Sequence, residues 1–93
     1  MTHAQLLQLQ SAHPDHIYLL AQGAFYHAYE QGAYRLNALL GYKVRPTPHG
    51  DMAGFPISAI DNVISRIIVC QPNKMVYSEP LSNNHLVIKI EQL

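Results

Sequence analysis

The sequence predicts one mixed α/β domain, spanning residues 1–93, in which about three helices flank a small mixed β-sheet. Its length fits a single domain. Apolar residues make up 48% of the chain, which supplies one modest core and excludes a disordered tail. Helix-like and strand-like segments alternate without internal repeat, in the order α-β-β-α-β-α-β-β, which is typical of helices packed on a small sheet.

The N-terminal segment predicts a short helix. Thr2 and Gln5 have the spacing of a capping box, in which each side chain bonds a backbone N–H of the other residue. Leucines give the following turns an apolar side. His13 precedes a proline and is therefore pushed out of helical geometry, so the helix should end there.

Two short strands should follow. The run IYLLAQ, residues 17–22, has the length and apolar character of a buried strand. After a glycine, FYHAY, residues 25–29, alternates so that Phe25, His27 and Tyr29 share one face of an extended segment. The rings of this segment are therefore divided between two faces of the sheet.

A helix, a strand and a loop fill the middle of the chain. Apolar residues recur at helical spacing over residues 30–40, and Gly41 is well placed to end that helix. YKVR, residues 42–45, reads as a strand. PTPHGD, residues 46–51, holds two prolines and a glycine and predicts a loop.

The C-terminal half predicts one more helix and two strands. MAGFP, residues 52–56, leads into a helix in which Ser58 and Asp61 have N-cap and N3 spacing. The apolar stripe of that helix consists of Ile57, Ile60, Ile64, Ile67 and Ile68. Strands are expected at residues 74–78 and 85–93, and the last one should lie at an edge able to pair with another chain.

The charge of the chain is sparse and balanced. Six basic and six acidic residues give a net charge of zero. A domain that holds DNA by electrostatics alone needs several Lys or Arg side chains on phosphates. The composition therefore argues against a purely electrostatic DNA binder and favours association with a partner or with a second copy.

The single cysteine and the lack of a long apolar run bear on where in the cell the protein is expected. Cys70 has no partner for an intramolecular disulfide, and its place at the end of an apolar helix predicts a buried, inert thiol. No signal peptide opens the chain, and no apolar stretch approaches the ~20 residues that span a bilayer. We expect a cytoplasmic protein.

Five phrases in order make the sequence similar to the N-terminal mismatch-recognition domain, domain I, of the DNA mismatch-repair protein MutS. They are HPD at 13–15, GAFYHAY at 23–29, AYRLNALLGYKV at 33–44, MAGFP at 52–56 and KMVYSEP at 74–80. MAGFP fits the family's Met-Ala-Gly-Ile-Pro almost letter for letter. The resemblance covers most of the chain and ends with the domain, because no clamp, lever or ATPase follows.

The resemblance implies a role for the phrase that contains Phe25. In the family, a Phe wedges into the duplex beside a mispaired base, and a Glu two residues later hydrogen-bonds that base. Phe25 matches the wedge, whereas His27 stands at the Glu position and Ala24 replaces the family's Asp. A histidine accepts or donates a hydrogen bond and gains charge toward its reference pKa of about 6.5, so the contact to the mismatch differs here.

Further nucleic-acid contacts are expected around this wedge. Lys43 and Arg45, with Arg35 nearby, are the candidates for phosphate contacts, and Tyr26 is a candidate neighbour of the wedge. The alternative for Phe25 is a core ring under the first helix. Tyr26 has its own alternative, a structural ring that packs with its hydroxyl at the rim.

Metal binding and catalysis find little support. His13 and His16 flank Asp15, but the proline between them prevents a helical ligand face and no fourth ligand is placed. The six acidic residues are scattered, and no nucleophile motif or phosphate loop is present. We therefore expect neither a metal, nor a cofactor, nor an enzymatic activity.

Two functions remain open. The first is a non-catalytic accessory domain that recognises mismatched or distorted duplex DNA, or an RNA–DNA hybrid, through an aromatic wedge. It would bind weakly alone and work with a larger protein such as a polymerase or reverse transcriptase, for example in a retroelement. The second is a protein–protein interaction scaffold that has lost direct DNA recognition and docks a partner or forms a homodimer.

Overall fold

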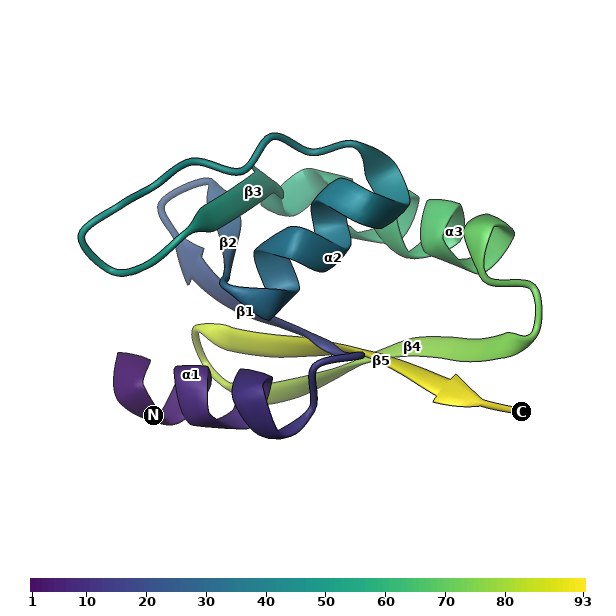
Figure 1. Cartoon of the computed structure of the whole chain (residues 1–93), viewed down its shortest axis with the longest axis horizontal. Helices are drawn as coiled ribbons and strands as arrows, with labels where there is room; N and C mark the ends of the chain where they lie inside the picture. Colours follow the sequence, from purple (N-terminus) through teal and green to yellow (C-terminus); the bar gives the residue numbers. More distant parts are fainter.

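Three helices cover the two faces of one five-stranded β-sheet in the computed structural model, which describes residues 1–93 (Figure 1). The elements are α1 His3–Ala12, β1 Ile17–Gln22, β2 Phe25–Tyr29, α2 Gln31–Leu40, β3 Met52–Pro56, a 3₁₀ turn Ile57–Ala59, α3 Ile60–Cys70, β4 Lys74–Ser82 and β5 His85–Gln92. The predicted fold class is confirmed. None of the helices has the length and apolar character needed to cross a membrane.

The strands lie in the order β3-β2-β1-β5-β4, and every pairing is antiparallel. A mixed sheet was expected, and the structure has antiparallel neighbours throughout. Two tight hairpins account for it: Gly23, at a φ of 58°, turns β1 into β2, and two asparagines turn β4 into β5. A hairpin of this length joins only antiparallel neighbours.

The larger core lies between the sheet and the pair α2 and α3. Its buried side chains come from the sheet and from both of these helices: Ile17, Leu19, Ala28, Ala33, Leu36, Ala53, Phe55, Val63, Ile67, Ile88 and Ile90. On β2 only Ala28 belongs to this set, because alternate residues of a strand point to opposite faces. Phe25, His27 and Tyr29 therefore point to the other side of the sheet.

The helix α1 covers part of that other side. Leu6 packs there with Tyr18, Tyr29 and Val87, all of which are buried. The predicted capping box at Thr2 is present and begins the helix. Because α1 lies over the central strands, the ends of β2 and β3 near Phe25 remain uncovered (Figure 1).

The segment before β3 differs from its prediction. Residues 42–45 are not a strand: only Arg45 pairs, with Met52, through two backbone hydrogen bonds of 2.8 Å. The carbonyl of Tyr42 accepts a hydrogen bond from Asn37 of α2 instead of pairing with β3, while its ring packs near Phe55. MAGFP, expected only to lead into a helix, forms the whole of β3.

Two predictions about α3 are also wrong. Ala59 occupies the N-cap position in place of Ser58, because a 3₁₀ turn precedes the helix, and no side chain caps it. Cys70 is exposed, because its thiol lies beside the carbonyl of Leu39 at an open groove between the ends of α2 and α3. Of the predicted apolar stripe, only Ile67 is fully buried, and Ile68 is 47% exposed.

The edge of the sheet also differs from its prediction. The last strand, β5, lies between β1 and β4, so β4 is the edge strand on that side. Sequence order alone misleads here, because the β4–β5 hairpin inserts its second strand beside β1 and leaves the first outside.

Candidate nucleic-acid interface

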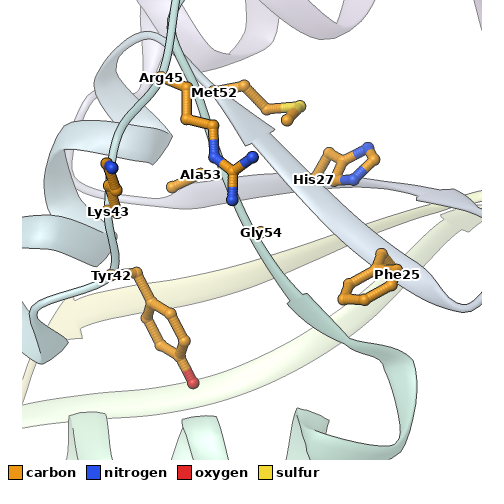
Figure 2. Close-up of a pocket in the computed structure, with 8 residues that line it drawn as sticks. All are labelled: Phe25, His27, Tyr42, Lys43, Arg45, Met52, Ala53 and Gly54. Atoms are coloured by element: carbon orange, nitrogen blue, oxygen red, sulfur yellow. The ribbon is translucent and has the colours of Figure 1, made fainter.

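A hollow of about 400 Å³ opens where β2, β3 and the segment 42–45 meet (Figure 2). It is lined by Phe25, His27, Tyr42, Lys43, Arg45, Met52, Ala53 and Gly54. Four of the six residues predicted as nucleic-acid contacts therefore lie around one cavity. The structure does not bring the other two, Tyr26 and Arg35, into it.

Phe25 stands at the rim of this hollow. It begins β2 directly after the hairpin turn and points to the face that α1 leaves uncovered. Its residue surface is 47% exposed, and it belongs to neither buried cluster. The alternative of a core ring under the first helix is therefore excluded, and the ring is free to contact a ligand.

His27 lies one pleat further along the same face. Its ring is within 12° of parallel to that of Phe25, with centroids 6.3 Å apart. Its Nδ1 is 3.0 Å from Oε1 of Gln22, and an amide oxygen only accepts, so Nδ1 carries the proton. Burial lowers the pKa of His27, which favours the neutral ring at pH 7 and leaves Nε2 as a hydrogen-bond acceptor.

Gly54 makes room for this histidine. It is the cross-strand partner of His27, and a Cβ at this position would lie 2.7 Å from Cδ2 of the ring and 2.8 Å from the carbonyl oxygen of Tyr26. No side chain fits in that space. The imidazole therefore occupies the place that a side chain at position 54 would need.

The backbone of Gly54 faces the hollow. Hydrogen-bonded and non-hydrogen-bonded residue pairs alternate along an antiparallel ladder. The N–H of Glu30 donates to the carbonyl of Asp51, and the N–H of Ile57 donates to that of Ala24. Counting inward from these pairs places Gly54 in a non-hydrogen-bonded pair with His27. Its N–H and C=O point away from β2. Segment 42–45 has already diverged there, so neither group has a partner.

The basic side of the hollow comes from segment 42–45. Lys43 and Arg45 are exposed, and neither forms a salt bridge, since the one ion pair of the molecule joins Lys89 to Glu79. Figure 2 shows the Arg45 guanidinium extending over Ala53 toward the centre of the hollow. Two unpaired cations thus flank an exposed ring, which suits a ligand that combines anionic groups with flat apolar ones.

Tyr26 and Arg35 have other surroundings. Tyr26 packs against Phe55 with ring centroids 5.8 Å apart, on the face that α2 and α3 cover. Arg35 is half-buried on α2, and its Nε is buried without a hydrogen-bond partner. Alternation along β2 was sufficient to separate Tyr26 from Phe25, whereas the position of Arg35 depends on how α2 packs.

His16, which the sequence places close to His13 and Asp15, has a structural role. Nδ1 of His16 accepts a hydrogen bond of 3.1 Å from the backbone N–H of Ile90, where β1 has not yet begun. Burial and the neighbouring His13 lower the pKa of His16. His16 therefore extends the pairing of β5 beyond the start of β1.

Four residues that line the hollow were not predicted: Tyr42, Met52, Ala53 and Gly54. MAGFP was interpreted as a turn before a helix, so the pairing of Gly54 with His27 was not foreseen. The signal was present, because a glycine within an apolar run often marks a close approach in a sheet.

No curated protein matches this chain significantly in sequence. The family model of MutS domain I matches residues 2–85. The match covers every helix and the sheet up to the first residue of β5, including all residues that line the hollow. The chain therefore belongs to the MutS domain I family, which is a non-catalytic DNA-binding domain that recognises mismatches.

Proposed function

We propose that this domain recognises mismatched or distorted duplex by inserting Phe25 between poorly stacked bases. The observation that carries the proposal is the position of an exposed phenyl ring at the rim of a hollow with two unpaired cations. The proposed interface consists of Phe25, His27, Lys43 and Arg45. RNA–DNA hybrid is the other duplex that the same chemistry accommodates.

The energetics of the wedge account for selectivity. Stacking of a base on an aromatic ring contributes about 1–3 kcal/mol. Opening a base step costs a few kcal/mol, and least where pairing is already poor. Insertion of Phe25 is therefore unfavourable in a matched duplex and close to balanced at a mismatch. We expect a preference of about 1–3 kcal/mol, which is roughly 5- to 150-fold in affinity.

The basic groups position the duplex without holding it tightly. If Lys43 and Arg45 each neutralise one phosphate, the logarithm of the binding constant falls with that of salt with a slope of about −1.8. The net charge of zero adds no long-range attraction. The domain then needs a larger protein to supply affinity and chemistry, such as a polymerase or a reverse transcriptase, including one encoded by a retroelement.

The experiment compares Phe25→Ala with Phe25→Trp. Binding to a labelled duplex with one mismatch and to its matched counterpart is measured by fluorescence anisotropy at two salt concentrations. We expect Phe25→Ala to bind both duplexes equally, whereas Phe25→Trp keeps the preference because it keeps a stacking ring. Circular dichroism checks that both variants fold. Equal affinity of the unmutated domain for the two duplexes would refute the proposal.

The second candidate function is a protein–protein interaction scaffold that has lost direct DNA recognition. The observation that favours it is an apolar groove between the ends of α2 and α3, lined by Leu39, Leu40, Ser65, Arg66, Val69 and Cys70. Absence of duplex binding at low salt, together with self-association, is the result that would select it.

A further inference from the structure

The sheet has a second free edge, at β4, on the side opposite the hollow. The pairing of β1 with β5 includes a bonded pair at Ala21 and Asn84, so Leu86, Ile88 and Ile90 direct their backbone groups to the β1 side. The intervening residues of β5 then bond to β4. By the β4–β5 register, these bonded partners in β4 are Met75, Tyr77 and Glu79.

It follows that the alternate residues of β4 direct their backbone groups outward. The N–H and C=O groups of Val76 and Ser78 have no partner, and neither has the C=O of Lys74. The N–H of Lys74 is occupied by the carbonyl of Gln71 at 3.1 Å. Such a row of unpaired groups is a template for another strand.

This row ends in a different way on each side. Pro80, in phase with the outward-facing positions of β4, has no N–H to donate, and the turn Gln71–Lys74, which contains Pro72, leads into β4 at its first residue. We propose that two copies of this chain pair through antiparallel β4 strands, with the two-fold axis at Val76. In that register Lys74 lies opposite the partner subunit's Ser78, so the ladder ends where the turn of one copy approaches Pro80 of the other.

The pairing gives partners to the N–H and C=O of Val76, the N–H of Ser78 and the C=O of Lys74 in both copies. Val76 of each copy donates to the other, and Ser78 of each donates to the carbonyl of the partner subunit's Lys74, which makes four hydrogen bonds. On the α1 side, Met75 lies opposite the partner subunit's Tyr77, and thioether–aromatic contacts are favourable. Met75 is 46% exposed in the single chain, so this contact buries apolar surface.

Neighbouring features support a second copy as the occupant. Exposed apolar side chains flank the connection from α3 to β4 on both faces: Ile68 and Val69 on the last turn of α3, and Met75 on the α1 side of β4. A net charge of zero removes the repulsion that opposes self-association. The other edge, β3, is disfavoured for self-pairing because Arg45 already pairs with it and Lys43 stands beside it, so two copies would bring like charges together.

The dimer would place the two hollows at the far ends of one ten-stranded sheet. Each hollow lies at β3, and nine strand spacings separate the two copies of β3, about 40 Å. One assembly would then present two Phe25 rings to a duplex, and simultaneous engagement strengthens binding without any new contact. The dimer itself does not depend on the proposed function of Phe25.

The first test is the mass of the chain in solution. Sedimentation equilibrium should show the average mass rising from the 10.5 kDa of one chain toward twice that value as protein approaches about 1 mM. A mass that stays at one chain over this range would overturn the proposal, and so would a trimer or larger closed assembly.

The second test is a matched pair of variants at Ser78. Ser78→Pro removes only an outward N–H and an exposed hydroxyl without a hydrogen bond, whereas Ser78→Ala removes the hydroxyl alone. We expect Ser78→Pro to raise the dissociation constant at least about tenfold, since two of the four hydrogen bonds are lost, and Ser78→Ala to leave it unchanged. Equal dimerisation of the two variants would show that β4 is not the interface.

The third test concerns register, in a Cys70→Ser background. Two copies of Val76→Cys would face each other with Cα atoms about 5.5 Å apart, within the range of a disulfide. Ser78→Cys would lie about 13 Å from its symmetry mate, too far to bridge. Oxidation should cross-link Val76→Cys alone. Cross-linking of Ser78→Cys in its place would overturn the two-fold axis at Val76.

Discussion

The Gln10 side chain offers the sharpest test of how the fold is held together. Gln10 is 3% exposed, and its amide joins α1 to the start of β1 through three hydrogen bonds. Nε2 donates to the carbonyls of His13 and His16 at 3.2 and 2.7 Å, and Oε1 accepts from the backbone N–H of Tyr18 at 2.9 Å. Gln10→Ala removes all three.

The loss of stability in Gln10→Ala follows from the backbone groups that lose their hydrogen-bond partner. The N–H of Tyr18 is buried, and leaving it without a partner costs about 1–3 kcal/mol. The two carbonyls lie near the surface and regain water, so each lost bond costs at most about 1 kcal/mol. We expect a loss of about 2–4 kcal/mol in the free energy of unfolding, out of the 5–15 kcal/mol typical of a domain.

Urea denaturation followed by circular dichroism measures this loss, and Gly32 supplies the control. A Cβ at Gly32 would lie directly against Oε1 of Gln10, so Gly32→Ala displaces the amide in the natural chain. In the Gln10→Ala background that clash is gone, and Gly32→Ala should cost less by at least about 1 kcal/mol. A loss below about 0.5 kcal/mol for Gln10→Ala, or additive effects of the two changes, would refute the reasoning.

Three further predictions concern titration, the hollow and the thiol. Burial lowers the pKa of three histidines, His16, His27 and His85, so the folded state favours their neutral forms. Their contribution to stability is fully present above pH 6.5, which is the histidine pKa in the unfolded chain, and it is lost as pH falls toward the lowered pKa values of the folded state. Urea titrations should therefore show a lower midpoint at pH 5.5 than at pH 7.5, and equal midpoints would contradict this prediction. Gly54→Ala should cost about 1–3 kcal/mol of stability and shift the His27 ring resonances in NMR spectra, since its Cβ would lie 2.7 Å from that ring; unchanged resonances would contradict the packing. Cys70 should react with a maleimide in the folded protein at a rate close to that of the unfolded chain, because its thiol is exposed; strong protection would contradict the position of α3.

Most of the fold was predictable from local patterns. The capping box at Thr2, the buried strand at residues 17–22 and the helix ended by Gly41 are confirmed as expected. These features depend on neighbours within a few residues, and such short-range rules act before tertiary contacts form. The exposure of Phe25 was also expected, from the resemblance to the mismatch-recognition domain.

The errors arise where distant segments compete. Residues 42–45 have a strand-like composition, but Asn37 of α2 takes the carbonyl of Tyr42, and one bridge remains at Arg45. Cys70 follows an apolar run, but it lies at the open groove between the ends of α2 and α3 and is therefore exposed. Apolar composition does not reveal which side of a helix finds a partner.

The sequence by itself determined that this chain is one α/β domain, where most of its helices and strands lie, and that Phe25 and His27 share a face, because these follow from periods of 3.6 and 2 residues. Only the tertiary structure decided that the face lies beyond the reach of α1, that Gly54 lies under His27, and that β4 is left at the edge. Strand order and register depend on contacts between residues far apart in the chain, and no local period encodes them.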